Sequence, residues 1–166
     1  MSKNNLVVER DKLAFSMSRI FDAPRELVWK VCNDPKLLPE WWGPGYLTTV
    51  VEKMDLREGG EWRYIQKDAE GNVYAFNGVF KEIKAPERLV YTFEFEPMAG
   101  HISTDTLTFE ELPEGKTLLT SWTTFDTLED LEGMLQSGME DGATETWDRL
   151  EELLESEKIN ASNPAK

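Results

Sequence analysis

Apolar and polar residues alternate through most of the chain, which is the period of strands that bury one face. The clearest stretch is 88–96, where the odd positions from 89 to 95 are apolar and positions 92, 94 and 96 are polar. Turn residues separate the alternating stretches at hairpin spacing. Strands joined by such short turns must be antiparallel. We predict seven strands, at 12–21, 47–56, 61–67, 73–84, 88–96, 102–112 and 116–125.

Between the first two predicted strands, the apolar residues are spaced as in a helix and no longer alternate with polar ones. Pro24 stands at the first position of a short helix, where its missing N–H costs nothing, and Cys32 falls on the apolar face of that helix. Asp34 is predicted to cap a second short helix. That helix carries Trp41 and Trp42 and ends at the Gly-Pro pair that follows them.

The C-terminal part of the chain is also predicted to be helical. From Leu128 to Leu154, apolar residues recur every three or four positions. A short lead-in helix begins at Thr127, and Ser137 with Glu140 forms the capping box of a main helix. We expect this main helix to run from about Ser137 to about Glu155.

The order of elements predicts an α+β fold in one domain. A curved antiparallel sheet of about seven strands surrounds the long C-terminal helix, and the two short helices follow the first strand. We assign residues 12–156 to this domain, residues 1–11 to a flexible N-terminus and residues 157–166 to a flexible tail.

Charge narrows the classes of partner. The 166 residues include 32 acidic and 18 basic ones, giving a formal net charge of −14. So negative a surface repels phosphate backbones and anionic lipids, and we expect no nucleic-acid partner. No stretch approaches the roughly 18 apolar residues of a membrane-spanning helix, so we expect no membrane insertion. The first residues lack the apolar run of a signal peptide, and we expect a cytoplasmic protein, monomeric or homodimeric.

The abundance of large rings suggests a cavity wall. The chain has six Trp, eight Phe and four Tyr, and many fall where they can face the helix. We predict an apolar cavity between sheet and helix, with a solid ring-filled core as the alternative. Gly142, inside the main helix, indicates either close packing or open volume there. The predicted wall consists of Trp41, Trp42, Trp62, Tyr64, Phe76, Phe80, Tyr91, Phe93, Phe109, Trp122, Met134, Met139, Gly142 and Trp147.

Signals of catalysis are sparse. The sequence lacks the short motifs of zinc, nucleotide and serine-nucleophile sites. We therefore expect no metal, no cofactor and no assigned catalytic residue, and the lone Cys32 is expected to be a buried structural thiol. Four side chains could place polar groups in the cavity, namely Arg63, Asn77, His101 and Asp105.

Several short motifs resemble one known family. Phe21–Trp29, Asp34-Pro35 and Trp41–Pro44 resemble the opening of START-like (SRPBCC) domains, in the branch named after the activator of heat-shock protein 90 ATPase. Further matches lie at 55–64, 78–83, 86–90, 137–142 and 147–150, so the resemblance spans about residues 13–155.

This resemblance implies a helix-grip fold, in which the sheet grips the C-terminal helix over a deep hydrophobic cavity. It also implies a ligand-binding or stress-related role. The chaperone activator has an additional N-terminal domain, whereas only about a dozen residues precede the first predicted strand here. A chaperone partner is therefore not our first expectation.

Three functions follow from these features. The first is non-enzymatic binding of a hydrophobic small molecule, such as a lipid, a polyketide or an aromatic metabolite. The second is an enzyme of the polyketide cyclase or aromatase kind, which would need the polar candidates to converge in the cavity. The third is a protein-interaction module or co-chaperone, which would need an exposed apolar patch.

Overall fold

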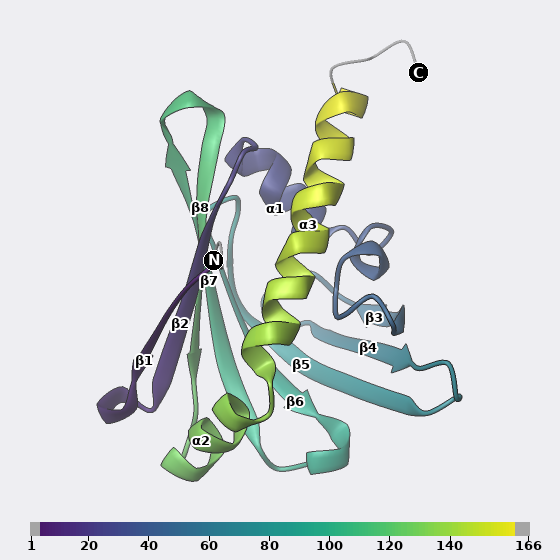
Figure 1. Cartoon of the computed structure of the whole chain (residues 1–166), viewed down its shortest axis with the longest axis vertical. Helices are drawn as coiled ribbons and strands as arrows, with labels where there is room; N and C mark the ends of the chain where they lie inside the picture. Colours follow the sequence, from purple (N-terminus) through teal and green to yellow (C-terminus); the bar gives the residue numbers. More distant parts are fainter. Residues whose placement is uncertain (1–3, 162–166) are drawn as a thin grey trace.

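The fold is one antiparallel sheet of eight strands with a long helix across its concave face (Figure 1). It is seen in a computed structural model that describes residues 4–161. The strand order is β1-β2-β8-β7-β6-β5-β4-β3. The strands are β1 Asn5–Glu9, β2 Ala14–Phe21, β3 Thr48–Met54, β4 Glu61–Lys67, β5 Val73–Lys84, β6 Arg88–Phe95, β7 Ile102–Leu112 and β8 Lys116–Thr124.

All seven predicted strands are present, and one more lies in the segment we had assigned to a flexible N-terminus. β1 pairs with β2, with Leu6 opposite Met17 and Val8 opposite Phe15. Leu6 and Val8 therefore face the core side of the sheet, as alternate residues of a strand must. The pattern is only five residues long and has polar neighbours, and for that reason the alternation was missed.

The first short helix is confirmed and the second is reduced to a single turn. α1 spans Arg25–Asn33 and begins one residue later than predicted, because Pro24 is its extended N-cap. The predicted second helix is a 3-10 turn at Leu38–Glu40. Pro39 lies inside that turn and has no N–H to continue a helix, and Gly43 then reverses the chain with a φ of 86°.

The C-terminal part forms two helices, as predicted, but their junction differs. α2 spans Leu128–Gln136, and the Thr127 side chain accepts a hydrogen bond from the Asp130 N–H at 3.1 Å. The capping box predicted at Ser137 is wrong, because Ser137 ends α2 and its hydroxyl donates to the Met134 carbonyl. α3 spans Met139–Ala161, six residues beyond the predicted end at Glu155. The remaining predicted tail, 162–166, lies outside the described residues.

α3 is the element that the sheet grips. Its buried residues Trp147, Leu150 and Leu154 join a core cluster with Phe21 of β2. The Phe21 and Trp147 rings meet edge to face with centroids 5.9 Å apart. In Figure 1 α3 runs along the open face of the sheet, with α2 at one end and α1 beside its other half.

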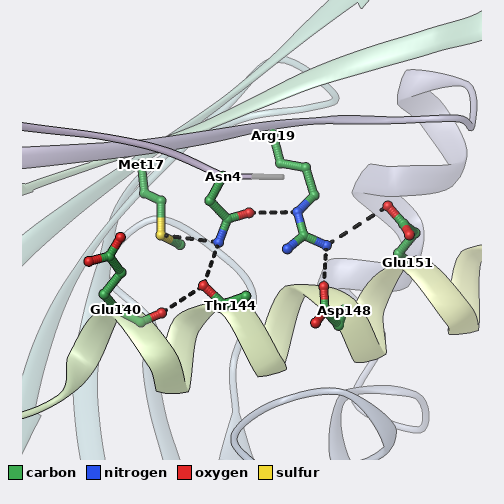
Figure 2. A network of polar contacts seen from close by, with 7 residues as sticks. All are labelled: Asn4, Met17, Arg19, Glu140, Thr144, Asp148 and Glu151. Atoms are coloured by element: carbon green, nitrogen blue, oxygen red, sulfur yellow. Dashed lines mark hydrogen bonds and ion pairs between the residues drawn. The ribbon is translucent and has the colours of Figure 1, made fainter. Parts of the chain in front are cut away.

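A buried charge ties β1 and β2 to α3 (Figure 2). Arg19 is only 2% exposed, and its guanidinium forms ion pairs with Asp148 at 2.9 Å and Glu151 at 3.8 Å. Its Nε donates to the Asn4 side-chain oxygen at 2.6 Å, and the Asn4 amide donates to the Thr144 hydroxyl at 3.1 Å. This network fixes the strand that the sequence did not predict.

Candidate ligand pocket

A cavity of about 110 Å³ lies between the sheet and the segment from α1 to Trp42. Seven of its thirteen lining residues are aromatic and three are leucine, so most of the wall is apolar. The lining residues are Cys32, Asn33, Leu38, Trp41, Trp42, Trp62, Tyr64, Phe80, Leu89, Tyr91, Phe93, Asp105 and Leu107.

The sheet register explains which strand residues reach this cavity. Tyr91 of β6 lies opposite Asp105 of β7, and Leu89 lies opposite Leu107. Alternate residues share a face, so the odd positions of both strands point to the concave side. Trp62 and Tyr64 point to the same concave side from β4, which is separated from β6 by β5.

The cavity is displaced from the place we expected. None of its lining residues belongs to α3, because the large side chains of that helix pack directly on the sheet and fill the space. The open volume lies instead under α1 and the turn that follows it, where Cys32 and Asn33 face the sheet.

Gly78 allows Trp62 to enter the wall. Gly78 lies opposite Trp62 in the β4–β5 pair. A Cβ at position 78 would overlap the Thr92 carbonyl oxygen and would lie 2.5 Å from Trp62 Nε1. The absence of a side chain at Gly78 therefore brings three strands close together behind the indole.

Asp105 is the acid of the pocket. Its carboxylate accepts a hydrogen bond from the Thr123 hydroxyl at 2.5 Å and another from the Tyr91 hydroxyl. Burial raises the pKa of Asp105 to about 6, and the two hydroxyl donors only partly oppose this effect. Its residual exposed surface is consistent with its position at the cavity.

The other titratable groups of the pocket are neutral at physiological pH. Cys32 is buried, as expected, and burial raises the pKa of its thiol to about 12, which disfavours the thiolate. Burial likewise raises the pKa of Tyr64 and Tyr91 above the ordinary value of 10.

Two indole N–H groups in the wall have no hydrogen-bond acceptor among the described residues. They belong to Trp41 and Trp62, which are 8% and 2% exposed. An unpaired buried donor costs about 1–3 kcal/mol. Trp62 Nε1 lies against the Gly78 backbone, whereas the Trp41 N–H is buried without an acceptor in the part of the chain that the structure describes.

The loop after Trp42 is fastened to α3. The Arg149 guanidinium donates to the Gly43 carbonyl at 2.6 Å, and the Gly45 N–H donates to the Glu145 carboxylate. The Thr49 hydroxyl also donates to the Trp42 carbonyl at 3.1 Å. These bonds hold the two tryptophans over the cavity.

The structure brings together eight of the eighteen residues proposed for the cavity. They are Trp41, Trp42, Trp62, Tyr64, Phe80, Tyr91, Phe93 and Asp105. Phe76 lies just behind them and packs on Trp42 and Phe93.

The other proposed wall residues lie elsewhere. Phe109 packs edge to face on Trp29, and Trp147 packs on Phe21, so both belong to the solid core. Trp122 is on the convex face, because its neighbours Ser121 and Thr123 face inward, and Lys12 lies 5.9 Å from its ring centroid. Met134 of α2 and Met139 and Gly142 of α3 do not line the cavity. A Cβ at Gly142 would meet no atom within 4 Å, so close packing does not explain that glycine.

Three of the four polar candidates lie outside the cavity. Arg63 and Asn77 occupy the convex face, where both bond Glu96, at 2.7 Å and 3.0 Å. These two donors lower the pKa of Glu96 to about 2. His101 is exposed and lies 2.8 Å from Asp130 at the start of α2. A shift of one residue in register reverses the facing of a strand residue, and for that reason the sequence did not settle these positions.

The sequence analysis missed several lining residues. Cys32 was assigned only to the helix core, and Asn33, Leu38 and Leu89 were not proposed for the wall. The Asn33 amide donates to the Trp29 carbonyl at 2.9 Å, at the C-terminal end of α1. In the sequence, only the position of Asn33 next to Cys32 on a short helix indicated that it could face the cavity.

The fold and the pocket together define a helix-grip domain with a small internal cavity. A sequence profile of the family described as Activator of Hsp90 ATPase homolog 1-like protein matches residues 22–155. The chain belongs to this family. The resemblance seen in the sequence motifs is thereby confirmed.

Solved structures agree with this assignment. A Mycobacterium smegmatis protein is 27% identical with a TM-score of 0.81, over 90% of this chain and 95% of its own. An Arthrobacter aurescens protein is 28% identical with a TM-score of 0.84, over 92% and 91%. A Rhodobacter sphaeroides protein, at 21% identity and a TM-score of 0.85 over 92% and 99%, shows the fold alone. No curated protein matches the chain.

Two further features of the described residues bear on other functions. Within residues 4–161, no helix has the length and apolar character needed to span a membrane. The same part of the chain contains no group of three or more His, Cys, Asp or Glu side chains placed to hold a metal ion.

Proposed function

We propose that this protein binds a small, largely apolar molecule in the pocket between α1 and strands β4–β7. The observation that carries the proposal is the partly open cavity with seven aromatic rings among its thirteen lining residues. Apolar cavities with a few convergent polar groups are the usual form of small-molecule sites. The family assignment supports a ligand-binding fold.

The size of the cavity limits the ligand. About 110 Å³ is somewhat less than the roughly 150 Å³ of an engineered cavity that binds benzene. The space favours a ligand about as large as one small ring. A lipid or a polyketide would have to displace wall side chains, so an aromatic metabolite is the best supported of the three classes we considered.

The two alternatives receive less support. A cyclase-like enzyme would need several polar groups around its substrate, and of the four candidates only Asp105 reaches the cavity. For a co-chaperone role, the support is the description of the matching family.

The test is a titration of purified protein with benzyl alcohol, 1-naphthol and a fatty acid, followed by tryptophan fluorescence and thermal unfolding. We expect benzyl alcohol to bind and the fatty acid not to. A ligand at 100 times its Kd stabilises the folded state by about 2.7 kcal/mol, which raises Tm by roughly 5–10 °C in a protein of this size.

A matched pair of variants locates the binding. Leu107→Phe adds volume inside the cavity, whereas Leu118→Phe makes the same change on the outer face of β8, opposite Ile20. We expect Leu107→Phe to abolish benzyl alcohol binding and Leu118→Phe to retain it. Equal binding by both variants, or no binding by the wild type, would contradict the proposal.

A further inference from the structure

The pocket contains an acidic side chain, Asp105, that pairs with no Lys, Arg or His among residues 4–161. Asp105 is partly buried where it meets the cavity, and its hydrogen-bond partners Thr123 and Tyr91 are neutral. No Lys, Arg or His lines the cavity. Among the described residues, no ion pair includes Asp105. A partly buried carboxylate without a counter-ion is costly and marks a candidate functional site.

We propose that the ligand of this pocket is a small organic ammonium cation that also carries a hydrogen-bond acceptor. This inference rests on the proposed function, because it names the chemical class that the same cavity would take. The positive group would lie beside Asp105, and the acceptor would face the Trp41 N–H.

The aromatic wall suits a cation as well as an apolar group. The seven rings come from three strands and from the segment after α1, so they surround the cavity rather than lie on one side. Cations are attracted to the faces of aromatic rings, most strongly to Trp, and the attraction strengthens as water is removed from around the pair. Trp41, Trp42 and Trp62 supply three indoles.

The N–H group of Trp41 is the reason to expect an oxygen atom on the ligand. The Trp41 N–H is buried and has no acceptor among the described residues. A cation alone cannot satisfy it, since an ammonium group has no lone pair. A hydroxyl or carbonyl oxygen on the same molecule would accept this bond and would remove the cost of an unpaired donor.

No neighbouring titratable group competes for the charge. The titratable groups facing Asp105 are Tyr91 on β6, Tyr64 on β4 and Cys32 on α1. Burial raises the pKa of each of them, so all three are neutral at pH 7. The net charge of −14 also concentrates cations near the protein.

The test compares choline with 3,3-dimethyl-1-butanol, which has the same shape and hydroxyl but no charge. Binding is measured by calorimetry at pH 8 and by tryptophan fluorescence. We expect choline to bind at least about tenfold more tightly than the uncharged alcohol, a difference of 1.4 kcal/mol. Equal or tighter binding of the alcohol would overturn the inference.

Two variants test whether the preference for choline over the uncharged alcohol depends on the Asp105 carboxylate. Asp105→Asn keeps the shape and removes the charge, whereas Asp126→Asn makes the same change at an exposed position outside the cavity. We expect Asp105→Asn to lose the preference for choline while still binding the uncharged alcohol, and Asp126→Asn to keep it. An unchanged preference in Asp105→Asn would overturn the inference.

The pH dependence gives an independent readout. Asp105 becomes neutral as pH falls below about 6, so choline binding should weaken between pH 7 and pH 5 while binding of the alcohol stays constant. A choline affinity independent of pH over this range would count against Asp105 as its partner. If benzyl alcohol binds but choline does not, this inference fails and the proposed function survives. If no probe binds, both fail.

Discussion

Asp105 gives the stability of the protein a pH dependence with a defined sign. Burial raises its pKa from an ordinary value of 3.8 to about 6. The folded state therefore binds the proton more tightly than the unfolded chain does. The tighter proton binding by Asp105 stabilises the folded state fully below about pH 4, and this stabilisation is lost as pH rises through 6.

We accordingly expect Asp105→Asn to stabilise the protein at pH 8, by roughly 1–3 kcal/mol, and to give no stabilisation at pH 4. Urea unfolding of both proteins across this range measures the difference, and the other titrating groups cancel in it. A variant that is less stable than the wild type at pH 8 would show that the Tyr91 and Thr123 hydrogen bonds outweigh the cost of burial.

Gly78 is expected to tolerate no side chain. The Cβ of an alanine would overlap the Thr92 carbonyl oxygen and press on the Trp62 indole, and a backbone oxygen cannot move away as a flexible side chain would. We expect Gly78→Ala to destabilise the fold by about 1–3 kcal/mol, as overpacking does. Thermal unfolding measures this, with Gly133→Ala as the control, because a Cβ there meets nothing within 4 Å. Similar effects at the two glycines would contradict the assigned role.

At the scale of elements, Asn4, the residue just before β1, bonds the buried Arg19. Asn4 accepts from the Arg19 Nε and donates to Thr144 of α3, so it connects the edge strand to the helix (Figure 2). Hydrogen bonds to charged groups contribute about 1.5–3 kcal/mol. We expect Asn4→Ala to destabilise the protein by about that amount.

Asn5→Ala is the matched control, since Asn5 is the adjacent residue, of the same type, and is exposed at the start of β1. Denaturant titration compares the two variants. If Asn5→Ala is as destabilising as Asn4→Ala, the effect belongs to the strand as a whole and not to the Arg19 network.

Elements with long, regular patterns were predictable from the sequence, and those governed by one residue were not. The alternation at 88–96 defined β6 because four apolar residues in a row of odd positions leave one possible facing. The 3-10 turn at Leu38–Glu40 was overestimated as a helix, because the apolar spacing was helical while Pro39 prevented the hydrogen bonding. The end of α2 depended on Gly138, whose φ of 84° ends a helix.

On the scale of the whole molecule, the fold was predictable and the exact position of the cavity was not. The motifs and the order of elements defined a sheet around a helix. A void, by contrast, is the small difference between the volume that elements enclose and the volume that side chains fill. Trp147 packs on Phe21 and fills the space that we expected to be open next to α3. Trp122 faces outward because the odd-numbered residues of β8, not the even-numbered ones, lie on the concave side of the sheet. The number of aromatic rings in the sequence does not show which rings line a cavity, which fill the core and which face outward.

The measurement that tests the central proposal most directly is a crystal structure of the protein soaked with benzyl alcohol. We expect the alcohol in the cavity between α1 and strands β4–β7, with its ring against Trp62 and Leu107 and its oxygen within hydrogen-bonding distance of the Trp41 N–H. A cavity closed by its own side chains, with benzyl alcohol absent or bound only at the surface, would contradict the proposal that this pocket holds a ligand.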